Sequence, residues 1–175
     1  MVDFSQLPYK RLELQRNDYL KMPGSTDTPI YLVESGSLKV FVVDGEEEQI
    51  IRFGYKGNIL VALDSYLTGR PSAFYIQAIK KSRIRVITKE IVMNGLTEAS
   101  YQKWWIEVLE NLVLQQMERE IDLLTASPKE RYLRVLKRSP ALFQEIPHRY
   151  IANYLRMCAE TLSRLKSLDM DQDLK

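Results

Sequence analysis

The sequence contains one cysteine, Cys158, and one histidine, His148, among its 175 residues. A single cysteine cannot form an intrachain disulfide. One cysteine and one histidine are also too few to build a zinc site or to ligate an iron–sulfur cluster. The same scarcity indicates a reducing, cytoplasmic setting, without a metal centre.

Long apolar runs and enzyme motifs are missing as well. No stretch approaches the eighteen or more apolar residues of a membrane span. The N-terminal MVDFSQLPYKRLEL carries an early acidic residue and no apolar run, so we expect no secretory signal and no membrane association. There is no nucleophile elbow, phosphate-binding loop or cluster of metal ligands, so we do not expect an enzyme.

Charge is spread unevenly along a chain whose overall charge is only +2. Hydrophobic residues make up 45% and charged residues 27%, which is typical of one globular domain or two small ones. Between positions 128 and 168 three acids accompany nine basic residues, Lys129, Arg131, Arg134, Lys137, Arg138, Arg149, Arg156, Arg164 and Lys166. A basic end is typical of a nucleic-acid footprint, although a solvated helical surface explains it equally well.

Residues 19–88 have the pattern of β-strands. The short runs PIYLVESG, SLKVFVV, EQIIRF and SRIRVIT alternate with turn residues, in an order that favours an antiparallel barrel or roll. Asp44-Gly45 predicts a two-residue hairpin turn, because glycine accepts a positive φ without strain. No helix of usable length is expected inside this zone.

Residues 96–124 change to a helical period. One apolar stripe consists of Ile106, Leu109, Val113, Met117, Ile121 and Leu124. A second, shorter stripe consists of Tyr101, Trp105, Val108 and Leu112. One face can pack on the β-zone and the other can meet a partner chain, so we expect a dimerisation helix. Its predicted contacts are Trp105, Leu109, Leu112 and Met117. The alternative is a helix buried wholly within its own subunit.

A further helix is predicted to begin at SPKER. Ser127 can cap it, Pro128 suits its first position and Glu130 falls at the capping-box position. Its expected apolar stripe is Tyr132, Leu133 and Leu136. Breaks at Pro140 and at IPHR then predict several short helices in the C-terminal zone.

This order of parts resembles the Crp/Fnr superfamily of bacterial transcription regulators. YLVESGSLKVFVVDGEEEQIIRFGYKGNIL is similar to the cyclic-nucleotide-binding fold, and IANYLRMCAETLSRLKSL is similar to the family's helix-turn-helix. The resemblance implies an α+β fold: an antiparallel, jelly-roll-like β-roll over residues 1–95, a long dimerisation helix over 96–126, and a small all-α helix-turn-helix domain over 127–175. Because only seven residues follow Leu168, we expect no β-hairpin wing. The implied partners are a second copy, an inverted-repeat site on double-stranded DNA and, as a further candidate, RNA polymerase.

The resemblance assigns DNA contacts to the last helix. The side chains expected to project from it are Glu160, Thr161, Ser163, Arg164 and Lys166. Arg164 can bond guanine O6 and N7 together, and Glu160 can accept from a cytosine amino group, whereas the other three suit phosphates. Leu155, Leu162 and Leu165 would form a small core behind them, where Ala152 lets the two helices approach closely.

The turn between the two helices departs from the family pattern. Arg156 lies where relatives usually have glycine, so we expect a strained or differently built turn. Cys158 is expected to be a buried turn residue, with a redox sensor as the alternative.

The family's nucleotide site also departs from its pattern. It needs a glutamate for the ribose and an arginine for the cyclic phosphate, but NILVALDSYLTGRPSAFYIQA contains no glutamate. Asp64 is its only acid and Arg70 its only cation, and Ser72 lies nearest the usual arginine position. A buried phosphate would lose its charge-assisted contact, so we expect no cAMP or cGMP. Haem is not expected either, since the sole histidine lies in the C-terminal zone. Another ligand could use these three residues with Phe74, or Phe74 and Tyr75 could fill the pocket.

The sequence therefore predicts a DNA-binding transcription regulator of Crp/Fnr type that senses an unidentified effector, or none, through its β-roll. The alternative is a regulatory ligand-binding or protein-interaction module of the same fold, whose helical tail only packs.

Overall fold

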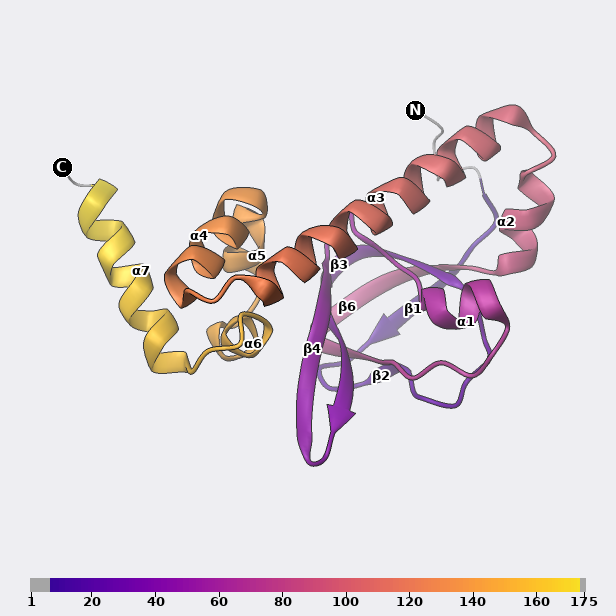
Figure 1. The fold of residues 1–175 in the computed structure, drawn as a ribbon. Coiled ribbons are helices and arrows are strands. Elements are labelled where there is room, and N and C mark those ends of the chain that lie inside the picture. Colours follow the sequence, from indigo (N-terminus) through magenta and orange to yellow (C-terminus); the bar gives the residue numbers. More distant parts are fainter. Residues whose placement is uncertain (1–6, 174–175) are drawn as a thin grey trace. The chain divides into compact units, whose positions relative to one another are not determined.

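The computed structural model describes residues 7–173 and divides into two compact units, Met1–Val113 and Leu114–Lys175. The first unit contains one six-stranded antiparallel sheet (Figure 1). Its strands are β1 (Lys10–Leu14), β2 (Tyr19–Lys21), β3 (Ile30–Asp44), β4 (Glu47–Tyr55), β5 (Ile59–Leu60) and β6 (Tyr75–Ile87). β1, β6, β3 and β4 are neighbours in that order, while β2 pairs with β6 and β5 with β3. The predicted α+β fold with an antiparallel roll is confirmed.

β3 is longer than the two strands predicted in its place, because Gly36 bends the chain without ending the strand. Gly36 has a φ of +87°, and the ladder between β3 and β6 shifts register on both sides of it. A Cβ at this position would lie 2.2 Å from Ser82 Oγ, so only glycine lets the two strands approach. β3 and β6 therefore form one continuous central pair.

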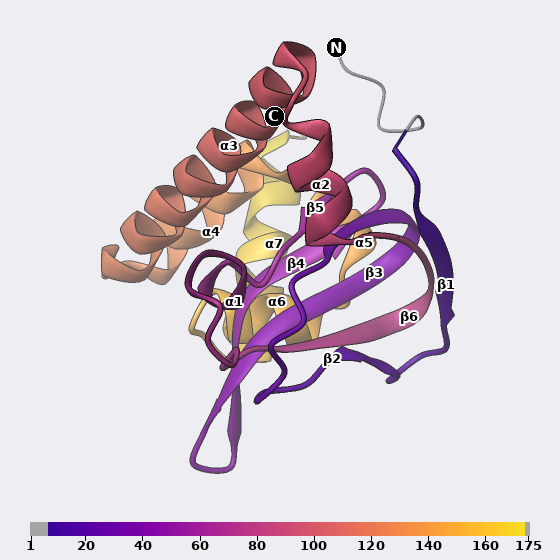
Figure 2. The ribbon, with the colours of Figure 1, turned by 90° about the vertical axis from the view of Figure 1, so that its right-hand side faces the viewer.

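The hairpin between β3 and β4 turns one residue later than the sequence indicated. Asp44 pairs with Glu47, which leaves Gly45 and Glu46 as the two turn residues, with Gly45 at a φ of +62°. Glycine thus occupies the first turn position. The hairpin extends beyond the rest of the sheet (Figures 1 and 2).

Two short helices interrupt or follow the strands, α1 (Leu63–Thr68) and α2 (Lys89–Gly95). The sequence predicted no helix of usable length within residues 19–88, and α1 is a helix of only six residues, closed by Gly69 in the left-handed conformation. Helical periodicity is invisible over six residues. α2 is capped by the hydroxyl of Thr88, which accepts from Ile91 N at 3.3 Å.

The long helix α3 (Ala99–Leu124) begins in the first unit and ends in the second (Figure 1). Its shorter apolar stripe is buried against the first unit, in a cluster of Leu7, Ile30, Tyr66, Ile87, Val92, Trp104, Trp105, Val108 and Leu112. Its longer stripe is largely exposed. Trp105 and Leu112, predicted to face a partner chain, therefore belong to the core of their own subunit. The bulkiest side chains in this segment cover the roll instead of meeting a second copy.

The second unit contains four further helices, α4 (Pro128–Arg138), α5 (Pro140–Glu145), α6 (His148–Tyr154) and α7 (Ala159–Asp173). The predicted start of α4 is confirmed, because Ser127 Oγ accepts from Glu130 N at 3.3 Å and Pro128 opens the helix. Its predicted stripe is partly wrong. Tyr132 and Val135 are buried, whereas Leu133 is 39% exposed.

Acids at the end of α3 neutralise two of the basic residues of α4. Asp122, which is fully buried, accepts from Arg134 Nε at 3.2 Å and from Arg138 at 2.5 Å. Glu118 accepts from the same two arginines at 2.9 and 3.0 Å. The basic excess counted along the sequence is therefore smaller on the folded surface.

No helix in the described residues is long and apolar enough to cross a membrane.

Candidate nucleic-acid interface and effector segment

α6 and α7 form two helices joined by a tight turn over residues 155–158. In this pair Ile151, Leu155 and Leu162 are completely buried, Ala152 is buried and Leu165 is half-buried. Leu155 and Leu162 occupy the places that the sequence predicted. Together these residues fix the angle at which α7 leaves the turn, and that angle decides which side chains α7 presents.

The turn is built on Arg156, which has a φ of +54°. Met157 N donates to Ala152 O at 3.0 Å, and Arg156 N donates to Asn153 O at 3.0 Å. These two bonds form a Schellman motif, in which the left-handed position is usually glycine. The strained turn expected from the sequence is therefore present.

The five side chains predicted to contact DNA all lie on α7. Glu160, Ser163 and Arg164 are exposed, whereas Thr161 and Lys166 are half-buried. Lys166 Nζ lies 2.5 Å from His148 Nε2 at the start of α6, a contact that the sequence did not reveal. The backbone N–H of Glu160 and the Cys158 thiol lower the pKa of the Glu160 carboxyl, so that it stays ionised to lower pH.

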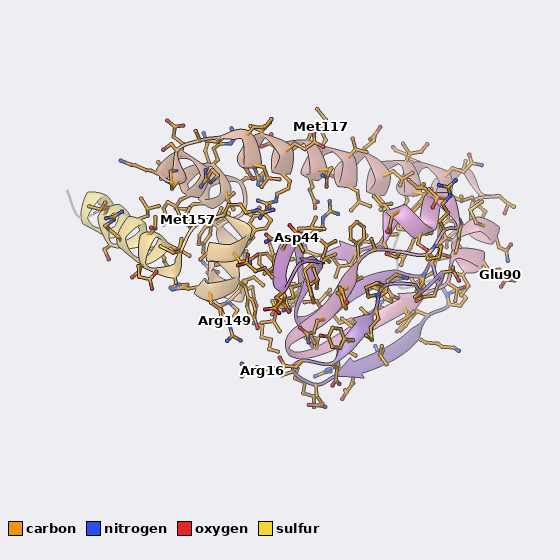
Figure 3. The ribbon with its side chains drawn as sticks, turned by 60° about the horizontal axis from the view of Figure 1, so that its bottom comes forward. Arg16, Asp44, Glu90, Met117, Arg149 and Met157 are labelled. Carbon is orange, nitrogen blue, oxygen red and sulfur yellow. The ribbon has the colours of Figure 1, made fainter. Side chains whose placement is uncertain are left out.

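Cys158 is exposed and not a buried turn residue. It immediately precedes α7, and its Sγ lies 3.1 Å from Thr161 Oγ1. Backbone hydrogen bonds and the buried side chain of Leu155 close the turn, and the Cys158 thiol stays exposed. Met157, the preceding residue of the turn, is labelled in Figure 3.

The predicted effector residues lie in and after α1. The Asp64 carboxylate accepts from Ser65 N at 2.8 Å, from Ser72 Oγ at 3.1 Å and from Ala73 N at 3.0 Å. Ser72 is buried, and its hydroxyl in turn accepts from Phe74 N at 3.1 Å. Asp64, Ser72 and the Phe74 backbone are therefore bonded together, whereas the side chain of Arg70 is exposed.

The aromatic residues that follow this segment pack within the first unit. Tyr75 stacks on Phe41 with ring centroids 4.9 Å apart, and Phe74 is half-buried. Among the side chains that the structure describes, those of residues 7–168, no group of three or more His, Cys, Asp or Glu could hold a metal ion.

A comparison with known protein families identifies the domain that contains this sheet. The sequence profile of the cyclic nucleotide-binding domain matches residues 11–98, which is about half of the chain. The chain belongs to this family. As a cyclic nucleotide-binding domain protein it carries the family's sheet together with α1 and α2. A comparison with curated proteins gave no match.

Several solved structures are similar to nearly the whole chain, including its helices. FixK2 from Bradyrhizobium japonicum has a TM-score of 0.77 at 15% identity, covering 95% of this chain and 87% of its own. A CooA mutant from Carboxydothermus hydrogenoformans has a TM-score of 0.72 at 17% identity, covering 94% and 77%. The regulator CLP of Xanthomonas campestris has a TM-score of 0.65 at 14% identity, covering 94% and 88%. At these identities the likeness shows the fold alone, and it confirms the predicted order of an antiparallel roll, a long helix and a small helical domain.

Proposed function

We propose that this protein is a DNA-binding transcription regulator of Crp/Fnr type and has no catalytic activity. The observation that carries the proposal is the pair α6–α7, in which a buried leucine core supports a helix with exposed polar residues at its N-terminal end. Arg164 is exposed there and its planar fork suits guanine O6 and N7, while Ser163 and Lys166 suit phosphates. CLP, which shares the fold, is a c-di-GMP-responsive global regulator of gene expression.

The exposed stripe of α3 supports a homodimer. Ile106, Val113 and Met117 are each more than half exposed, and Ile121 and Leu124 continue the same face. Met117 projects from the outer side of the helix (Figure 3). Apolar residues repeated at spacings of three, four and seven suit a paired helix, and leaving them in water is unfavourable. We propose that a second copy covers this stripe, and that the resulting dimer binds an inverted repeat.

The effector segment supports the proposal that cAMP and cGMP are not ligands. Asp64 already occupies the N–H groups of Ser65 and Ala73 and the hydroxyl of Ser72, and it would repel a phosphate at the same donors. The only cation of the segment, Arg70, has an exposed side chain. The residues present therefore do not fit a cyclic phosphate, whatever else the protein senses.

A salt titration of DNA binding tests the main proposal. Fluorescence anisotropy with duplexes selected from random DNA should give an affinity whose logarithm falls linearly with the logarithm of salt concentration. Selected sequences should converge on an inverted repeat with half-sites about one helical turn apart. Absence of binding at low salt would support the alternative, a regulatory ligand-binding or protein-interaction module whose helical tail only packs.

A further inference from the structure

Arg131 on α4 binds the turn between α6 and α7. Its Nε donates to Leu155 O at 2.9 Å and one terminal nitrogen donates to Arg156 O at 3.1 Å. The other terminal nitrogen donates to Thr125 O at 2.6 Å and to Ala126 O at 3.0 Å. One guanidinium therefore joins four backbone carbonyls, two from the turn and two from the linker after α3.

The turn needs such a partner for two reasons. The last carbonyls of a helix have no intrahelical donor, and the carbonyl of Leu155, the C-cap of α6, is one of them, while the Arg156 carbonyl belongs to the turn that follows. In addition, Arg156 holds a φ of +54°, a left-handed conformation that is unfavourable for a residue with a Cβ atom. Charge-assisted hydrogen bonds to these carbonyls offset both costs.

We propose that Arg131 is a positioning residue for DNA binding, holding the α6–α7 turn in the conformation that aims α7 even though the turn has no glycine. The inference rests on the proposed function. Because the same guanidinium also binds Thr125 O and Ala126 O, the turn is held relative to the α3–α4 linker within the second unit. Arg131 is thus one of the nine C-terminal cations but acts on the backbone instead of on phosphates.

The experiment is a double-mutant cycle. Arg131→Lys keeps the charge but cannot bridge four carbonyls, because an ammonium lacks the planar fork. Arg156→Gly removes the conformational cost of the left-handed position. The two single variants, the double variant and wild type are compared by thermal unfolding and by anisotropy with selected and scrambled duplexes over a salt series. Lys129→Ala is the matched control, an exposed cation of the same helix.

We expect Arg131→Lys to weaken binding to the selected duplex about tenfold, which corresponds to about 1.4 kcal/mol, with scrambled binding and the salt slope unchanged. In the Arg156→Gly background the same change should cost less than about threefold, because a glycine turn depends less on the clamp. Arg131→Lys should also lower the melting temperature less in the Arg156→Gly background than in wild type. Lys129→Ala should leave the melting temperature unchanged.

Three results would overturn the inference. An equal loss in both backgrounds would show that Arg131 does not act through the turn. A uniform loss on all duplexes with a salt slope reduced by about one would make it a phosphate contact. If Arg131→Lys fails to fold, a folded double variant supports the clamp and an unfolded one contradicts it. Absence of DNA binding by wild type would reject the proposed function alone, since the thermal cycle still tests the clamp.

Discussion

The buried carboxylate of Asp122 accepts a hydrogen bond of 2.5 Å from the guanidinium of Arg138. Arg134, one turn earlier in α4, donates to the same carboxylate at 3.2 Å. Asp122 lies two residues before the end of α3. This cluster therefore fixes the last turn of α3 to α4 across a linker of three residues.

Asp122→Ala should lower the free energy of unfolding by on the order of 3 kcal/mol, because two arginines lose a buried partner. Glu118→Ala is the control, since the Glu118 side chain is 43% exposed and binds the same arginines. It should cost less than about 1 kcal/mol. Urea unfolding followed by circular dichroism measures both. Equal costs for the two variants would contradict the buried role of Asp122.

The same cluster shows why the C-terminal charge could be counted but not interpreted. The nine cations were visible in sequence, but the partners of Arg134 and Arg138 are acids of α3 that lie before the counted range. Arg131 is likewise bound to backbone carbonyls that no sequence pattern marks. Pairing of this kind arises only when the helices pack.

Leu112→Glu should unfold the protein or destabilise it severely, not simply separate a dimer. Leu112 is 3% exposed within the α3 cluster. Truncating such a leucine costs about 2–5 kcal/mol, and a buried carboxylate adds to that cost. Thermal unfolding should show the loss. If Leu112→Glu has the wild-type melting temperature, Leu112 does not lie in the core.

Met117→Glu is the corresponding probe of the exposed stripe. Met117 is 54% exposed, so the carboxylate should leave the fold of each subunit intact while opposing the approach of a second helix. Sedimentation should show a shift from dimer to monomer, with unchanged circular dichroism. A dimer that persists in this variant, or a wild type that is monomeric at the same concentration, would place the contact elsewhere.

The two apolar stripes of α3 show which features of the fold helical periodicity can predict. Spacings of three and four identified both faces of α3 and its C-terminal end at Leu124. They could not say which face the roll covers, because that depends on the positions of Tyr66 and Val92, which reach α3 through tertiary packing. Periodicity and turn residues also predicted the order of strands and helices, whereas they could not predict the exposed Cys158 or the hydrogen bond from Ala73 N to Asp64.

Glu34→Gln should destabilise the first unit at neutral pH and have no effect in strong acid. A hydrogen bond from Arg85, together with the charge of Arg11, lowers the pKa of the Glu34 carboxyl. Because the folded pKa lies below the unfolded one, the stabilisation is present above the usual glutamate range and is lost as pH falls through the lowered pKa.

Melting temperatures measured from neutral pH into strong acid should therefore converge for wild type and Glu34→Gln. Glu13→Gln is the control, since the Glu13 side chain is 57% exposed and its ion pairs to Lys81 and Arg83 span 3.8 and 3.9 Å. It should change the melting temperature little at any pH. A constant difference between wild type and Glu34→Gln at all pH values would exclude the ion pair as the cause.

Millimolar cAMP or cGMP should leave the melting temperature unchanged. A ligand at one hundred times its dissociation constant stabilises by about 2.7 kcal/mol, which a thermal scan detects. 5′-AMP at the same concentration controls for non-specific effects. A clear shift with either cyclic nucleotide would mean that Asp64 releases Ser72 and Ala73 when the ligand arrives.

Arg164 and Lys166 should respond differently to truncation. Arg164 is exposed on the first turns of α7, so Arg164→Ala should cost about 1–3 kcal/mol on the selected duplex and relax the preference at one base pair. Lys166→Ala should weaken binding on all duplexes alike and reduce the salt slope by about one.

The contact of Lys166 with His148 holds its ammonium at the start of α6, so His148→Ala should give a weaker form of the Lys166→Ala result. None of these changes should alter the circular dichroism, because Leu162 and Leu155 anchor the helix and are untouched. Titrating each variant against selected and scrambled duplexes at several salt concentrations separates the roles. If all variants bind like wild type, α7 is only a packing helix and DNA is bound elsewhere or not at all.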